Sequence, residues 1–340
     1  MMEHRRIGAV WGAVLSPAVG ILPVLAARQG GQGGWLAPLI ALPGLLLLLP
    51  TWGALGRRKD AVGRPLTIIY IMWVLVLACA RLRLSVQRLQ FTAQRESNLW
   101  VFLPVLAAAA AWLAWGEVEA FGRAAAVFGR ILTLALLALL VLTLFQIQPE
   151  NLFPLWTGDI LPVLRAAVPA LGVLCYGVYG AFLWDGMESA PVKRRASGGC
   201  VLLALLLLSV LGNLGAPLAA ALENPFLTLS RRVGVEGAFQ RVESLVSTLW
   251  LLGDLALLGL LLWACRCLVE RLAPRWKGRW VALTGALVVL LGAGLVFRDA
   301  IFAQWFEYTL APLGNLLLGA AVPCTVYLLE RRKCGGTSCA

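Results

Sequence analysis

Residues 131–145 read ILTLALLALLVLTLF, a run in which threonine is the most polar side chain. An α-helix needs about 20 predominantly apolar residues to cross a lipid bilayer. Comparable runs recur along the whole chain, at 45–49, 107–111, 201–210 and 255–263. These runs predict an all-α integral membrane protein that forms a single polytopic transmembrane domain over residues 1–340.

The overall composition supports the same interpretation. Of the 340 residues, 60% are hydrophobic and 14% are charged, whereas roughly 25% are charged in an ordinary soluble domain. The net charge is +12, which on a soluble protein could indicate nucleic-acid binding. In a membrane protein, basic loops fix the topology and face anionic lipid. We therefore expect membrane lipid, and not nucleic acid, as a partner.

The hydropathy pattern predicts about ten transmembrane helices. The loops on the side of both chain termini hold more Lys and Arg than the loops on the other side. The positive-inside rule then predicts that both termini are cytoplasmic. The expected spans are 7–27, 35–55, 65–90, 99–116, 124–147, 162–184, 199–221, 241–268, 280–298 and 305–329.

Motifs of soluble catalysis are absent from the sequence, which has no phosphate-binding glycine loop, no GxSxG and no HExxH. The only histidine, His4, lies in the amino-terminal tail. Cys334 and Cys339 lie in a basic carboxy-terminal tail without a histidine nearby. We therefore expect no enzymatic activity, no catalytic residue, no cofactor and no metal site.

Two spans contain residues that interrupt helices. The first holds Pro17, Gly20 and Pro23, and the sixth holds three glycines between residues 172 and 180. Proline removes a backbone hydrogen bond from a helix. The two spans are five apart, which is typical of transporters with two inverted five-helix repeats and discontinuous helices 1 and 6. The repeats would occupy about 7–147 and 162–298, with 305–329 as a flanking helix.

Unwound backbone at these breaks would leave N–H and C=O groups free to bind a small ligand. The alternative is that glycine and proline serve close helix packing, as is common in membranes. If the breaks bind a ligand, we expect residues of span three to line the side of the ligand cavity. The candidate ligand-binding residues are Ala18, Val19, Gly20, Ile21, Leu22, Tyr70, Trp73, Tyr176, Gly177 and Gly180.

Ionisable side chains within the spans are further candidates, because charge inside a membrane is costly and usually functional. Glu243, Asp254 and Arg81 are expected to form an ion or polar pathway. Arg81 and Glu243 could instead lie near the outer interface and extend toward water. Asp254 stands between apolar residues on both sides. We therefore expect it to face the bundle interior, with Arg81 or Arg130 as its partner.

Several short motifs resemble those of a known family. GILP at 20–23 and GGQGGW at 30–35 are similar to its first-helix break and the following loop. GEVEAFGR at 116–123 is similar to its turn after span four. FQRVESL at 239–245, followed by Trp250, resembles its entry into span eight. NLFP at 151–154 resembles one of its outer loops. The chain thus resembles the spore germination permease family, the B-type membrane subunits of germinant receptors within the amino acid–polyamine–organocation superfamily.

The resemblance implies a ten-helix fold of the Na⁺-coupled amino-acid symporter type. It also implies a receptor that binds a small nutrient germinant, typically an amino acid, in the inner membrane of a spore. A larger A-type membrane subunit and a C-type lipoprotein subunit are the implied partners. TAQR at 92–95 departs from the family's Thr-Pro turn, which leaves the ligand's identity open. Two alternatives stay open: a secondary active transporter that moves an amino acid with H⁺ or Na⁺, and a membrane scaffold without a ligand.

Overall fold

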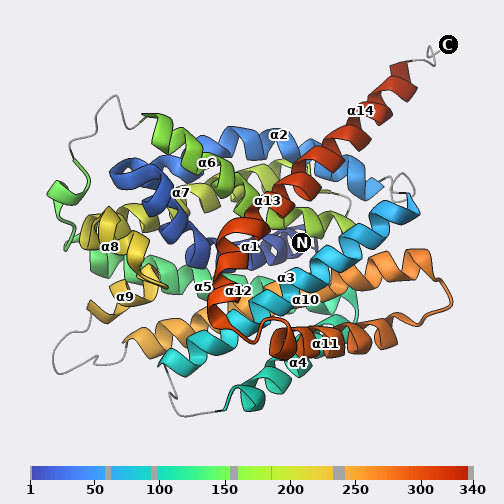
Figure 1. The fold of residues 1–340 in the computed structure, drawn as a ribbon. Coiled ribbons are helices and arrows are strands. Elements are labelled where there is room, and N and C mark those ends of the chain that lie inside the picture. Colours follow the sequence, from blue (N-terminus) through green and yellow to red (C-terminus); the bar gives the residue numbers. More distant parts are fainter. Residues whose placement is uncertain are drawn as a thin grey trace.

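The computed structural model describes residues 2–57, 63–92, 98–153, 160–184, 186–232 and 242–335. Within these ranges the chain is helical, without a β-strand, and forms one bundle (Figure 1). The expected all-α fold is confirmed. The elements are α1 Met2–Gly30, η1 Gly31–Leu36, α2 Ala37–Arg57, α3 Arg64–Thr92, α4 Leu99–Trp115, α5 Val118–Leu144, η3 Pro149–Asn151, α6 Ile160–Leu174, η5 Cys175–Phe182, α7 Ala190–Leu214, α8 Ala216–Ala221, α9 Pro225–Arg232, α10 Val242–Leu272, α11 Gly278–Leu295, α12 Ala300–Trp305, η6 Phe306–Leu310, α13 Ala311–Leu316, η7 Leu317–Ala321 and α14 Val322–Gly335.

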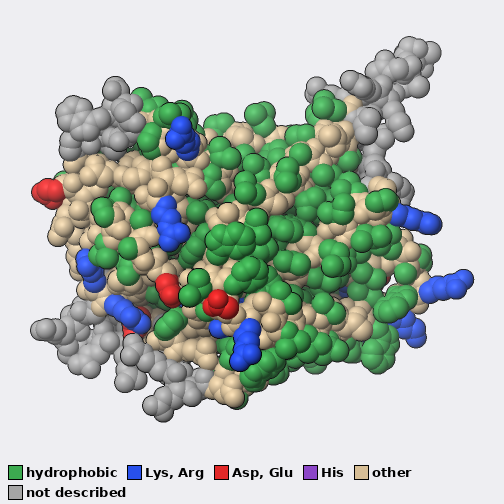
Figure 2. Space-filling model, in the orientation of Figure 1, with side chains coloured by type: hydrophobic (Ala, Val, Ile, Leu, Met, Phe, Trp, Pro, Cys, Tyr) green, Lys and Arg blue, Asp and Glu red, His purple; other side chains and the backbone are tan. Residues whose placement is uncertain are grey.

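Apolar helical segments account for all the expected spans. Eight segments of the described chain are long and apolar enough to cross a membrane, and one of them, Gly8–Arg57, contains both α1 and α2. Helix α4 is a further, shorter apolar helix. Large apolar side chains such as Leu47, Trp112 and Phe145 are exposed on the outside, and Figure 2 shows apolar side chains over most of one face. Acyl chains are the natural surroundings of such a surface.

Helix α1 lies at the centre of the bundle. It packs against α5, α6, α7 and α10, and most of its side chains from residue 8 onward are buried. The approach to α5 is closest at two glycines, where a Cβ on Gly12 would lie 2.5 Å from the Cα of Gly129. Only residues without a side chain allow the two backbones to come this close.

The turn between α1 and α2 depends on two glycines of the GGQGGW segment. Gly31 has a φ of +55°, a left-handed conformation that favours glycine. A Cβ on Gly34 would lie 2.2 Å from the carbonyl oxygen of Ala26. The glycine-rich turn therefore folds directly onto the end of α1.

The predicted break in span one is wrong. Helix α1 runs as an unbroken α-helix from Met2 to Gly30, with Pro17 and Pro23 inside it. Each proline costs the helix one backbone hydrogen bond, but membrane helices tolerate this where neighbouring groups pair with the freed backbone. Beside Pro17, the indole Nε1 of Trp250 donates to the carbonyl oxygen of Ser16 at 3.0 Å and so anchors α1 to α10. Packing against four helices holds the rest of α1 in the α conformation.

Span six changes conformation where its glycines predict. Helix α6 ends at Leu174, and the chain continues as the tighter 3₁₀ helix η5 over Cys175–Phe182. Span ten is irregular in a way that was not expected, because the π-helical segments η6 and η7 separate α12, α13 and α14. Such wide turns are rare and occur frequently at functional sites.

Helix α7 begins at Ala190 rather than near residue 199. Pro191 stands in its first turn, where the fixed φ of proline favours a helix start. Lys193, Arg194 and Arg195 therefore lie on the first turns of a helix instead of in a loop.

Candidate functional site

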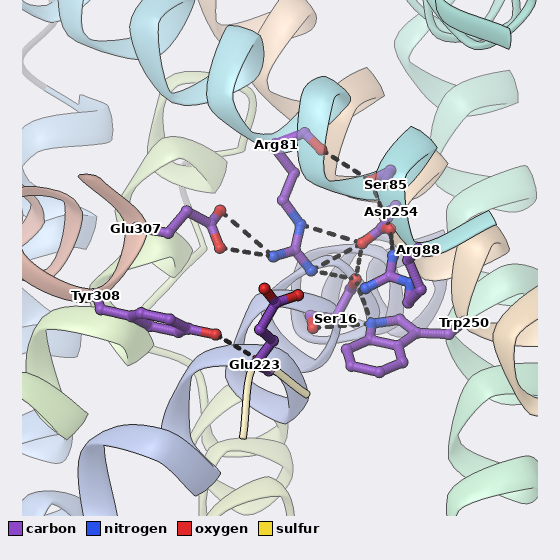
Figure 3. A network of polar contacts seen from close by, with 9 residues as sticks. All are labelled: Ser16, Arg81, Ser85, Arg88, Glu223, Trp250, Asp254, Glu307 and Tyr308. Carbon is purple, nitrogen blue, oxygen red and sulfur yellow. Dashed lines mark hydrogen bonds and ion pairs between the residues drawn. The ribbon is translucent and has the colours of Figure 1, made fainter. Parts of the chain in front are cut away.

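Four charged side chains meet in the interior of the bundle (Figure 3). Arg81 and Arg88 come from α3, Asp254 from α10 and Glu307 from η6. The exposed fraction of their side chains is between 0% and 6%. Two positive and two negative charges face one another, so the four sum to zero. We call these residues the charge cluster.

Asp254 is the central acceptor of the charge cluster. Arg81 donates to its Oδ1 from Nε at 3.1 Å and from Nη2 at 2.8 Å. Ser85 donates to its Oδ2 at 2.6 Å, and Arg88 forms an ion pair with the same oxygen. The hydroxyl of Ser16 on α1 donates to Oδ1. Asp254 thus ties α10 to both α3 and α1.

Arg81 also bridges to the second carboxylate. Its Nη1 lies 3.0 Å from Oε2 and 3.3 Å from Oε1 of Glu307. Glu307 occupies the first π-helical segment of span ten, where the wider turn sets its direction. The guanidinium of Arg81 therefore joins α10 and span ten through one side chain.

Trp250 forms one wall of the charge cluster. Its indole Nε1 lies 3.1 Å from the hydroxyl of Ser16, and the guanidinium of Arg88 lies 3.9 Å from the centre of its ring. This stacking adds a cation–π attraction to the ion pair. On another side, the ring of Phe226 from α9 meets Trp250 edge-on at 5.5 Å. The short helix α9 thus contacts the site directly.

A small cavity of about 30 Å³ adjoins the charge cluster. Arg81, Arg88 and Glu307 line it together with Gly20 of α1. A volume of this size holds about one water molecule. The hydroxyl of Tyr308, which also lines it, donates at 2.8 Å to the carbonyl oxygen of Glu223, which lies between α8 and α9. This bond ties the segment around Glu223 to the wall of the cavity.

Gly20 has a clear reason to lack a side chain. A Cβ there would lie 3.2 Å from the ring of Trp250 and 3.8 Å from Nη1 of Arg81. The four other candidate ligand-binding residues of α1 flank Gly20 in the sequence and are buried in the apolar core: Ala18, Val19, Ile21 and Leu22.

The aromatic candidates gather around a second polar residue, Asn315 of α13. Trp73 Nε1 donates to its Oδ1 at 3.0 Å, and the hydroxyl of Tyr179 donates to the same oxygen at 2.7 Å. Tyr70 donates to the carbonyl oxygen of Leu318 at 2.6 Å. The hydroxyl of Tyr176 and Nδ2 of Asn315 are buried without a hydrogen-bond partner among the described residues.

The two glycines of η5 face side chains of neighbouring helices. A Cβ on Gly177 would lie 2.8 Å from the ring of Trp52, and one on Gly180 would lie 2.7 Å from Val10. These distances fit the packing alternative for both positions.

Of the three expected pathway residues, two come together and one lies apart. Asp254 pairs with Arg81 and faces the interior, whereas Arg130 bonds to the carbonyl oxygen of Ala126 in its own helix. Glu243 pairs with Arg231 at the first turn of α10. It is about 16 Å along the helix from Asp254, at roughly 1.5 Å per residue.

Sequence reasoning missed Arg88, Glu307 and Ser16. One signal was present, because Arg81, Ser85 and Arg88 are spaced at i, i+4 and i+7 on one face of a helix. Glu307 gave no such signal, since it stands near the start of span ten, where a charge is ordinary.

Comparisons with known proteins agree with this architecture. The structure of MhsT in complex with L-phenylalanine is similar over 92% of this chain and 88% of that one, with a TM-score of 0.67 and 15% identity. A Na⁺-coupled sialic acid symporter in a substrate-bound outward-open state is similar over 93% of this chain and 77% of that one, with a TM-score of 0.63 and 12% identity. Identities this low show a shared fold and no more.

No curated protein matches the sequence significantly. The family described as spore germination protein matches it over residues 56–296, which include the spans from α3 to α11. The chain therefore belongs to the spore germination protein family.

Proposed function

We propose that the chain is the membrane subunit of a nutrient germinant receptor and that it binds a small amino acid in the membrane interior. The charge cluster beside Gly20 is the observation that carries the proposal. Removing an ion from water costs several kcal/mol even when it is paired. Membrane proteins retain such groups mainly where they serve a ligand, an ion or a proton.

The cluster has the chemistry to recognise an amino acid zwitterion. The ligand's carboxylate would pair with the guanidinium groups of Arg81 and Arg88, and its ammonium group with Glu307. Arg81 and Glu307 pair with each other in this structure, so the ligand would exchange with an existing ion pair. The cavity holds only about one water. Binding therefore requires the segment around Glu223, which Tyr308 holds at the cavity, to move.

The remaining candidate residues would shape this site. Gly20 would provide space for the ligand, and Ala18, Val19, Ile21 and Leu22 would hold α1 in place. Tyr70, Trp73 and Tyr176 would close the inner side. Gly177 and Gly180 would set the position of η5 against its neighbours.

The cellular setting is part of the same proposal. The excess of Lys and Arg in the loops on the side of the termini supports two cytoplasmic termini. The family supports a place in the inner membrane of a spore, with an A-type membrane subunit and a C-type lipoprotein as partners.

Variants of Glu307, which belongs to the charge cluster, and of Glu243, which lies apart from it, provide a matched test. Glu307→Gln removes the proposed partner of the ligand's ammonium group, whereas Glu243→Gln changes a carboxylate of the same helix bundle that pairs at the surface. Spores carrying each variant are exposed to a panel of amino acids, and the amount of folded protein in their membranes is measured. We expect Glu307→Gln to need roughly tenfold more amino acid or to give no response, and Glu243→Gln to respond normally. A normal response of Glu307→Gln would refute the ligand site.

A secondary active transporter is the second candidate. Two buried carboxylates, Asp254 and Glu307, could couple transport to H⁺ or Na⁺, and the fold is shared with a Na⁺-coupled symporter. Purified protein in liposomes, loaded with ion gradients and radiolabelled amino acids, separates the two functions. Gradient-driven uptake would favour the transporter, and saturable binding without uptake would favour the receptor.

A further inference from the structure

A groove of about 480 Å³ lies between α1, α5 and α7, on the side of the bundle where α1 and α7 begin. Its apolar wall is made by Trp11 and Leu15 of α1, Leu134 of α5 and Leu202 of α7. Three arginines line it as well: Arg130, Arg194 and Arg195. We call it the arginine groove.

The arginine groove carries positive charge that no described carboxylate balances by an ion pair. Arg130 donates through Nε to the carbonyl oxygen of Ala126 at 3.1 Å, and among the described residues no carboxylate forms an ion pair with any of its three arginines. Arg195 lies close enough to Arg130 and Arg194 for both to repel it. Three like charges around one opening favour an anion between them.

The order of side chains along the helices matches an amphiphile. Arg194 and Arg195 stand on the first turns of α7, and Leu202 lies about two turns deeper on the same helix, at roughly 3.6 residues per turn. Arg130 and Leu134 are one turn apart on α5 in the same sense. Charge therefore stands at one level and an apolar wall follows it into the membrane. A free phosphate would use only the first of these features.

Missing side chains keep the arginine groove open. Gly198 and Gly199 line it, and no heavy atom lies within 4 Å of the position that a Cβ would take on either residue. On the opposite wall, the guanidinium of Arg195 lies over Gly8, since its Nη1 is 2.7 Å from the position of a Cβ there.

We infer that the arginine groove binds an anionic phospholipid of the cytoplasmic leaflet. Its phosphate pairs with the three arginines, and one acyl chain lies along the apolar wall. Basic pockets between transmembrane helices on the cytoplasmic side recognise anionic headgroups in this way. The lipid also contacts α1 at Leu15, next to Ser16, which donates to Asp254 of the charge cluster.

Binding of phosphatidylglycerol to the purified full-length chain tests the inference, with phosphatidylcholine as the uncharged comparison. Bound lipid is counted by native mass spectrometry over a titration in detergent. The double variant Arg194→Gln/Arg195→Gln removes charge from the groove. Lys193→Gln is its control, because Lys193 is exposed on the same turn and does not line the groove. We expect the affinity to fall roughly fivefold for each arginine removed and to be unchanged in the control.

Gly199→Leu fills the arginine groove while it leaves all charges in place, so it tests the acyl-chain position separately. We expect weaker phosphatidylglycerol binding and a normal elution profile in size-exclusion chromatography. If this variant does not fold, the comparison of the arginine variant with Lys193→Gln decides. Equal binding of both lipids, equal binding by the arginine variant, or displacement of phosphatidylglycerol by millimolar inorganic phosphate would overturn the inference.

Discussion

Replacing Asp254 by asparagine tests the charge cluster most directly. The change keeps the size of the side chain and removes one negative charge from a group that is fully buried. It also turns one acceptor oxygen into an N–H donor, opposite the N–H groups of Arg81 and Arg88. The cluster then holds two positive charges and one negative charge on side chains that are at most 6% exposed.

The magnitude follows from the number of groups that lose their partner. Removal of one member of a buried ion pair costs about 3–5 kcal/mol, because the other charge stays buried without compensation. Asp254 serves two guanidinium groups and two hydroxyls, so we expect the upper part of that range. Adding Arg88→Gln restores the charge balance. We therefore expect the double variant to recover about 1–3 kcal/mol relative to the sum of the two single changes.

The free energy of unfolding can be measured in mixed micelles by titration with a denaturing detergent. Glu188→Gln is the control, since it breaks an ion pair with Arg57 whose side chains are 45% and 40% exposed. We expect it to cost less than about 1 kcal/mol. The reasoning would be refuted if Asp254→Asn lowered the free energy of unfolding no more than the control does. It would also be refuted if the effects of Asp254→Asn and Arg88→Gln on this free energy were strictly additive in the double variant.

Three further predictions concern packing and hydrogen bonding. Gly177→Ala should lower the free energy of unfolding by about 1–3 kcal/mol, since its Cβ would lie 2.8 Å from the buried ring of Trp52. Gly116→Ala, which meets no atom within 4 Å, should change it by at most about 0.5 kcal/mol, and equal effects would contradict the packing argument. Asn315→Leu leaves a buried donor, Tyr179, and a part-buried donor, Trp73, without their shared acceptor and should cost about 2 kcal/mol or more. Ser16→Ala removes a hydroxyl that bonds to the charge cluster and should cost about 1–3 kcal/mol; the same detergent titration checks both, and wild-type stability would count against either.

Much of the fold could be predicted from apolar runs alone. A run of about 20 apolar residues has few stable alternatives to a membrane helix, so the spans and their order were correct. The break in span one was wrong for a physical reason. Pro17 weakens α1 locally, but packing against four helices holds α1 in place. Trp250, more than two hundred positions away, adds a bond to the Ser16 carbonyl oxygen. Such tertiary compensation leaves no trace in local sequence.

The site was predictable to the extent that it depends on burial cost. Asp254 stands in an apolar run, and the need for a buried partner pointed to Arg81 or Arg130, of which Arg81 forms the pair. Glu307 could not be found in this way, because its place in the cluster depends on the π-helical turn of η6. A π-helical turn changes the direction of a side chain, and no particular residue type marks such a turn in the sequence.

Trp250 and Tyr308 connect the charge cluster to α9 and to the segment around Glu223. The edge of Phe226 rests against Trp250, and the Glu223 backbone is held by the Tyr308 hydroxyl. A change that repositions Arg88 would also move the indole of Trp250, on which its guanidinium is stacked. This movement would weaken the contact of Trp250 with Phe226. A change in the membrane interior would then reach the surface through the release of α9 and the Glu223 segment, without a movement of the long helices.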